Sequence, residues 1–184
     1  MQRKGSIYLL FFVISVFLLG YELLIARGET YYYTSLGIIL IGLFGFFFCF
    51  EKGKPNAILL TMIASLCALA IVSRVAFFFL PQIKPIAAII ILAGIAFGTE
   101  VGFVTGAVSA FVSNFYFGQG SWTPFQMFAL GLIGAFAGLF FCGKKYSGWQ
   151  IVLYGFLSVL LIYGGIVDVN TIFLLHKKSV FCML

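Results

Sequence analysis

The chain has 184 residues, of which 63% are hydrophobic and only 9% are charged, and its formal net charge is +6. A soluble domain carries roughly 25% charged residues, so this composition excludes a soluble globule and indicates an all-α, polytopic bundle of transmembrane helices in a lipid bilayer. The basic residues lie mostly at the ends of apolar runs, which excludes nucleic acid as a partner.

Apolar runs of the length of membrane spans follow one another along the chain. A helix needs ~20 apolar residues to cross the hydrocarbon core of a bilayer. We predict seven spans, over residues 6–25, 36–50, 57–80, 86–98, 101–116, 125–142 and 149–167. The fourth run is too short to cross without tilting, breaking or ending in a water-filled recess. The first run has no small-residue cleavage site and is predicted to remain as an anchor.

Lysine and arginine set the expected orientation. If the spans alternate in direction, one side of the membrane receives three basic pairs: Arg3 and Lys4, Lys52 and Lys54, and Lys144 and Lys145. The loops on the other side receive only Arg27 and Lys84, whereas Lys177 and Lys178 in the tail do not fit the pattern. We therefore predict a multi-pass plasma-membrane protein with a cytoplasmic N-terminus and with residues 81–85 and 118–124 outside.

Small residues recur at every fourth position within the apolar runs. The pattern comprises two series of glycines and one pair of alanines: Gly94, Gly98, Gly102 and Gly106; Gly134 and Gly138; and Ala64 and Ala68. Small side chains at this spacing let helix backbones approach closely in lipid, so the glycines predict tight packing within residues 86–142. The alanine pair alone is a weak signal, because alanine is common in membrane helices.

The sequence FGQGSWTPFQM, residues 117–127, is a polar, turn-forming segment between two apolar runs. Irregular backbone at a membrane surface must find water or protein partners, and polar side chains there can orient a polar organic solute. The candidate solute ligands at this predicted level are Asn114, Gln119, Trp122, Thr123, Gln126 and Asp168. For a tryptophan, an interfacial anchor is the commoner use.

Arg74 is an additional candidate, because it lies within an apolar run about six residues from its predicted outer end. A charge at that depth in lipid is costly and usually faces a cavity or a partner. Two interpretations of Arg74 stay open: contact with a solute, or a structural arginine that is paired or reaches the interface.

Groups for bond-breaking chemistry are sparse. The acidic residues are Glu22, Glu29, Glu51, Glu100 and Asp168, with no carboxylate pair at helical spacing, and the single histidine, His176, has no metal-ligand partner. We therefore predict that the protein is not an enzyme and has no catalytic site, metal or cofactor. The chain has no glycine loop for ATP phosphates, so uphill transport would draw on a partner or an ion gradient.

From residue 57 onward, the chain resembles a known family of membrane proteins. The resemblance rests on Ala64 and Ala68, on the runs 73–98, 100–115 and 117–141 (which contains FGQG-WTP-QM), and on Tyr163, Gly164, Gly165 and Asp168. Over roughly two thirds of its length, the sequence is similar to the substrate-binding S components of energy-coupling factor (ECF) vitamin transporters, which are prokaryotic ABC importers.

The resemblance implies a function without chemistry. S components are six-helix membrane proteins that capture a vitamin at the outer face. They dock on a transmembrane coupling subunit that carries two ATPase subunits, and Ala64 and Ala68 match the docking face. Residues 1–56 would then be an N-terminal two-helix extension, and residues 57–184 the S-component domain. The most similar subgroup is assigned to cobalamin.

One departure from the family concerns the end of the chain. After the Asp168 region the family continues with an outer loop and a last helix, whereas TIFLLHKKSVFCML does not resemble that segment. We therefore expect a C-terminally truncated member with five of the six family helices. The alternative function is a stand-alone small membrane transporter or scaffold without an ATPase partner.

Overall fold

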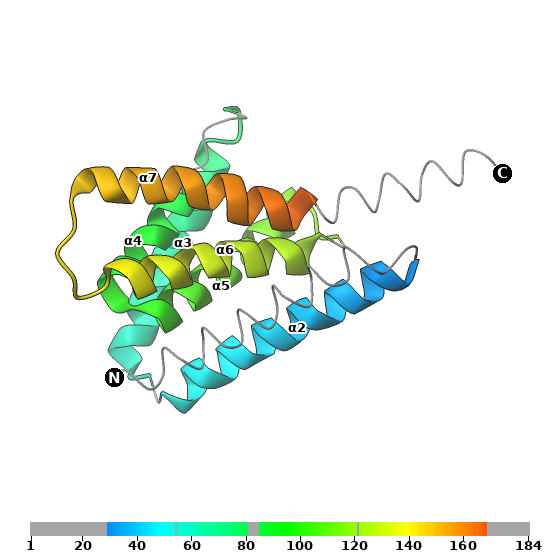
Figure 1. Ribbon diagram of the computed structural model, residues 1–184, viewed down its shortest axis with the longest axis horizontal. Helices are drawn as coiled ribbons and strands as arrows, with labels where there is room; N and C mark the ends of the chain where they lie inside the picture. The colour runs from blue at the N-terminus through cyan, green and yellow to red at the C-terminus, as the bar shows by residue number, and fades with distance from the viewer. Residues whose placement is uncertain (1–28, 54, 81–84, 121, 169–184) are drawn as a thin grey trace.

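Helices form nearly all of the computed structural model, which describes residues 29–53, 55–80, 85–120 and 122–168. The helices are α2 (Glu29–Lys52), α3 (Ala57–Ala76), α4 (Ile86–Phe97), α5 (Thr99–Phe117), α6 (Thr123–Phe141) and α7 (Gly148–Ser158), which continues as the π-helix η1 (Val159–Gly164) (Figure 1). The described residues contain no strand, so the all-α prediction is confirmed. The predicted first span and the tail, with His176, Lys177 and Lys178, lie outside the described residues.

Three described helices are long and apolar enough to cross a membrane: Ala57–Ala76, Thr123–Phe141 and Gly148–Asp168. α4 is apolar but has only 12 residues, which is about 18 Å at 1.5 Å per residue, so the predicted short run is confirmed. Large apolar side chains such as Phe44, Phe156 and Leu161 are exposed on the outside of the bundle. Such a surface suits a lipid environment rather than water.

The predicted bounds were wrong at two helices. α2 begins at Glu29 instead of residue 36, because three tyrosines at 31–33 lower the hydropathy although tyrosine is well tolerated at a membrane interface. α3 ends at Ala76, four residues before the predicted end. Its last turn gives way to a turn in which the Leu80 N–H donates to the Phe77 carbonyl at 3.1 Å.

α5 lies at the centre of the bundle, in contact with α2, α3, α4 and α6. Figure 1 shows α2 and α7 on opposite sides of the α5–α6 pair. Most of α5 is buried, including four polar residues: Thr105, Ser109, Ser113 and Asn114. These residues and its glycines lower the hydropathy of α5, which therefore is not among the three span-like helices.

Glycines bring the backbones of α4, α5 and α6 into direct contact. A Cβ atom at Gly94 or Gly102 would collide with the Gly134 carbonyl, and one at Gly138 would collide with the backbone of Thr99. α4 and α5 are joined through Gly98 alone, whose φ of 96° lies in the left-handed region that favours glycine. The prediction that the glycine series serve tight packing is confirmed.

α2 packs into the core through aromatic side chains. The Phe46 ring stacks on the Phe103 ring with centroids 3.9 Å apart, and Phe103 meets Phe128 edge to face at 6.4 Å. Ile39 and Leu43 of α2 belong to the same buried cluster. α2 is therefore part of the bundle and shares one core with α5 and α6.

Candidate functional site

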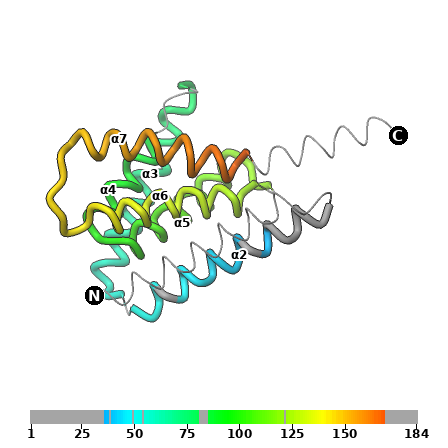
Figure 2. The backbone as a smooth tube through the Cα atoms, in the orientation of Figure 1, coloured from blue at the N-terminus to red at the C-terminus, as the bar shows by residue number. Residues whose placement is uncertain are grey.

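Seven polar side chains from three helices, the loop before α6 and η1 form one connected hydrogen-bond network. We call this set the polar network; its members are Arg74, Ser113, Asn114, Gln119, Thr123, Gln126 and Tyr163. Figure 2 shows why they meet: after the turn at 142–147 the chain runs back along α6, so that the end of the last helix lies beside the first turn of α6.

Asn114 is the centre of the polar network. Its Oδ1 accepts from Nη1 of Arg74 at 3.0 Å, and its Nδ2 donates to Gln126 Oε1 at 2.9 Å and to Thr123 Oγ1 at 3.3 Å. Both amide protons and one oxygen lone pair are therefore used. Because Asn114 is only 1% exposed, these bonds replace the water that its amide loses on burial.

Thr123 fixes the loop that leads into α6. Its hydroxyl donates to Gln119 Oε1 at 2.9 Å and accepts from the Gly120 N–H at 3.2 Å, in addition to the bond from Asn114. Gln119 in turn donates to the Phe111 carbonyl at 3.1 Å. The hydroxyl uses its one proton and both lone pairs, and so ties residues 118–120 to the end of α5.

Gln126 connects the network to the last helix. Its Nε2 donates to the Tyr163 hydroxyl at 3.2 Å while its Oε1 accepts from Asn114. Tyr163 lies in η1, and π-helical turns are frequent at functional sites. The hydroxyl of Tyr163 accepts one bond and retains its proton for a further acceptor.

Arg74 approaches the network from α3. Its Nη1 donates to Ser113 Oγ as well as to Asn114, and its guanidinium lies over the Phe117 ring, 4.6 Å from the ring centroid. No carboxylate whose side chain the structure describes forms an ion pair with Arg74. The structure thus places a half-buried cation on an aromatic face among neutral amides and hydroxyls.

Five of the seven predicted solute ligands lie in the polar network: Arg74, Asn114, Gln119, Thr123 and Gln126. Trp122 lies beside it and is 38% exposed; its ring packs against Gly120, where a Cβ atom would collide with it. Asp168 is exposed at the end of the last described helix, and no hydrogen bond joins it to the network. Sequence reasoning missed Ser113 and Tyr163 as members.

A second surface lies on α3, at the predicted docking pair. Ala64 and Ala68 are both exposed, as are Thr61 and Ser65. The Thr61 hydroxyl donates to the Ala57 carbonyl and the Ser65 hydroxyl to the Thr61 carbonyl, each at 2.9 Å. The small side chains therefore form a smooth surface whose hydroxyls are already paired within the helix.

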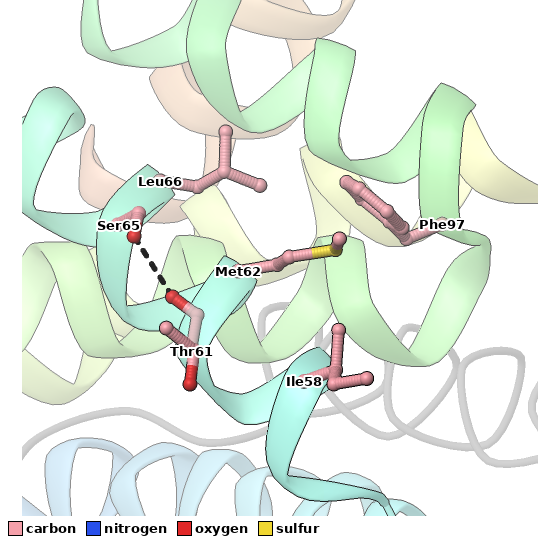
Figure 3. A pocket seen from close by; sticks show the side chains of 6 residues that line it. All are labelled: Ile58, Thr61, Met62, Ser65, Leu66 and Phe97. Atoms are coloured by element: carbon pink, nitrogen blue, oxygen red, sulfur yellow. Dashed lines mark hydrogen bonds between the residues drawn. The ribbon is translucent and has the colours of Figure 1, made fainter.

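A shallow groove of about 510 Å³ adjoins this surface (Figure 3). Its lining comes from the first half of α3 and the end of α4: Ile58, Thr61, Met62, Ser65, Leu66 and Phe97. The sticks in Figure 3 show Met62 extending between Ile58 and Phe97. The start of α3 is therefore next to the end of α4, at the end of the molecule opposite the polar network.

The described basic residues are distributed unequally between the two ends. Lys52 ends α2 just before α3 begins, and Lys144 and Lys145 follow the end of α6. Since Gly138, near that end of α6, packs on Thr99, all three lysines lie at the end that carries the groove. Arg74 lies at the opposite end, in the polar network.

A family model matches most of the S-component-like region. Residues 59–179 match the model described as ECF transporter, substrate-specific component. The match extends beyond Asp168 into residues that the structure does not describe. A search of curated proteins and a search of solved structures returned no match. Because the matched segment is more than half of the chain, the chain belongs to the family of substrate-specific components of ECF transporters.

Proposed function

We propose that the protein captures a small water-soluble vitamin at the polar network, with cobalamin as the first compound to test, and delivers it to an ECF module. Membership of the family supports the transport role and the association with coupling and ATPase subunits. The observation that carries the choice of site is the polar network itself. It gathers amide, hydroxyl and guanidinium groups from five segments of a chain that is 63% hydrophobic.

The same proposal includes an orientation. Positively charged residues favour the cytoplasmic side of a membrane, and Lys52, Lys144 and Lys145 lie at the end with the groove. The polar network then faces the exterior of a prokaryotic cell, where an imported solute arrives. The N-terminus, which lies outside the described residues, would begin in the cytoplasm.

Docking on the coupling subunit is assigned to the α3 surface around Ala64 and Ala68. Helices associate in lipid where small side chains let their backbones come close. On α3 the small residues are exposed, and the hydroxyls of Thr61 and Ser65 are satisfied within the helix. A partner helix can therefore approach this surface without breaking a hydrogen bond.

Binding to the purified chain tests the capture function. The protein in maltoside detergent would be titrated calorimetrically with cyanocobalamin, riboflavin, thiamine, biotin, pantothenate and nicotinate. Saturable binding of one compound, weakened by Gln126→Ala, is the expected result. The exposed loop variant Lys145→Gln, at the opposite end, serves as the control. Binding that Gln126→Ala leaves unchanged would place the site elsewhere, and no binding by any vitamin would contradict the capture function.

Ala64→Arg tests the docking surface separately. A long charged side chain on this exposed face should block helix contact with the coupling subunit, while the polar network at the other end of α3 stays intact. We expect uptake by cells carrying the complete transporter to be abolished and vitamin binding by the purified variant to be unchanged. Leu69→Arg, on the same helix, measures the effect of an arginine in lipid alone. Equal loss of binding and uptake in Ala64→Arg would reject the docking role.

A further inference from the structure

Arg74 has more hydrogen-bond donors than the described structure uses. A guanidinium carries five N–H groups and no acceptor. In the described structure Nη1 alone donates, to Ser113 and Asn114. The remaining N–H groups have no acceptor among the described residues, although the residue is half-buried at the end of a helix that is apolar enough to cross a membrane.

The positive charge of Arg74 is also uncompensated by the acids whose side chains the structure describes. Its contacts are a hydroxyl, an amide oxygen and the Phe117 ring, none of which carries a full negative charge. Two of the described acids, Glu51 and Glu100, lie at the opposite end of the bundle, and Asp168 forms no ion pair with Arg74. An unpaired charge in a half-buried site is costly, and arginine forms its strongest bonds with carboxylate and phosphate oxygens.

We propose that the captured solute carries an anionic oxygen group, a carboxylate or a phosphate, which pairs with the unused face of the Arg74 guanidinium. This inference rests on the proposed capture function and specifies the chemical class of its solute. The neutral amides of Asn114 and Gln126 then contact the uncharged part of the solute, and the free proton of Tyr163 supplies one more donor. Lipid phosphate is a second source of the same chemistry, and the experiment separates the two sources.

The experiment compares acidic compounds with neutral partners of similar shape. The pairs are nicotinate and nicotinamide, pantothenate and panthenol, biotin and biotinamide, riboflavin 5′-phosphate and riboflavin, and cyanocobalamin and dicyanocobinamide, which lacks the phosphodiester. Each is titrated into the wild type and into Arg74→Gln, Arg74→Lys and Lys144→Gln in maltoside detergent. Lys144→Gln removes the same charge from an exposed residue at the opposite end of the molecule.

In the pair that binds, the acidic member should bind the wild type about tenfold more tightly than its neutral partner. In Arg74→Gln this ratio should fall to about one, whereas Arg74→Lys should keep part of it and Lys144→Gln all of it. Equal affinity of the two members for the wild type overturns the inference and leaves the capture function standing. An acid preference that survives in Arg74→Gln also overturns it. If no compound of any pair binds, the capture function itself fails.

One fallback comparison and one further measurement complete the experiment. If Arg74→Gln elutes as an aggregate, the wild-type ratio and the Arg74→Lys ratio decide alone. The titration is repeated in phosphatidylcholine nanodiscs. An acid preference present in detergent and absent in nanodiscs would mean that lipid phosphate occupies Arg74 in a membrane, which would reject the assignment to the solute. A preference that persists in nanodiscs supports it.

Discussion

Two buried polar residues of α5, Ser109 and Asn114, differ in how well their side chains are hydrogen-bonded. Asn114 makes three side-chain bonds, to Arg74, Thr123 and Gln126. The Ser109 hydroxyl is fully buried and makes no hydrogen bond of good geometry with the described residues; the weakly bonding thiol of Cys67 is its neighbour. Burial without a partner costs stability, whereas removing a satisfied group leaves its partners unsatisfied. The same operation, truncation to alanine, should therefore have different consequences at the two sites.

We expect Asn114→Ala to destabilise the protein by about 2 kcal/mol. The substitution removes a hydrogen-bond partner from the Gln126 amide, the Thr123 hydroxyl and the Arg74 guanidinium. Ser109→Ala should be neutral or slightly stabilising, since it removes an unsatisfied hydroxyl and almost no volume. Thermal unfolding in maltoside detergent, followed by intrinsic tryptophan fluorescence, measures both. A comparable loss in the two variants would contradict the described network.

Among single residues, the sequence singled out five of the seven members of the polar network, and their binding of a solute stays a prediction. Asn114, Thr123 and Gln126 were found because polar residues in an apolar chain are rare, so each one stands out. Ser113 and Tyr163 were missed because both residue types are common in membrane helices and only the helix arrangement brings them to Arg74 and Gln126. Of the two interpretations left open for Arg74, the structure shows pairing with network side chains; contact with a solute remains a proposal.

Among the helices, α4, α5 and α6 form a unit held by backbone contact. Gly134 faces the Gly102 carbonyl so closely that a Cβ atom would collide with it. Because the obstacle is backbone, no side-chain rotation can relieve the clash. The three helices must separate to admit even one methyl group, and dispersion between their backbones would be lost with the separation.

Gly134→Ala should therefore destabilise the protein, by about 2 kcal/mol or more, as for overpacking of a dense core. Gly37→Ala is the matched control, because nothing lies within 4 Å of a Cβ atom at that position of α2. In a helix interior this change from glycine to alanine ordinarily stabilises by up to about 1 kcal/mol. The melting temperatures of the two variants should consequently move in opposite directions; a rise in both would show that α6 is free to shift.

The order and kind of the elements were predictable because hydropathy and glycine spacing both follow from the lipid environment. Each predicted run that falls within the described residues contains a helix. The start of α2 and the end of α3 were not predictable. The tyrosines at 31–33 and the phenylalanines at 77–79 are aromatic residues that occur both within membrane helices and at the membrane interface. Hydropathy alone does not separate these two situations.

For the whole molecule, the packing of α2 changes the meaning of the predicted N-terminal extension. Residues 1–56 were separated from the rest because the family resemblance begins near Ala57, and that division remains a prediction. The structure shows that Phe46 stacks on Phe103 at the centre of the bundle. An S-component domain without α2 would expose this part of α5 and α6, so the two predicted domains share one core.

Phe46→Ala measures that shared core. Phe46 is 5% exposed, and its removal should leave a cavity beside Phe103 and cost roughly 3 kcal/mol. Phe44→Ala is the control on the same helix, because Phe44 is 72% exposed and faces away from the core. Thermal unfolding of both variants is the measurement. If the two are equally stable, α2 is an accessory helix that the family bundle does not need.

The polarity of α5 also has a consequence for how the protein is made. A nascent helix enters the bilayer according to its own hydropathy, and α5 buries Thr105, Ser109, Ser113 and Asn114 along its length. α6 is span-like by itself and supplies Thr123 and Gln126 to Asn114. We expect nascent chains that end after α5 to leave this helix poorly inserted, and chains that extend through α6 to insert it. Glycosylation mapping of such truncated chains during synthesis would show whether the polar network is assembled only after α6 has emerged from the ribosome.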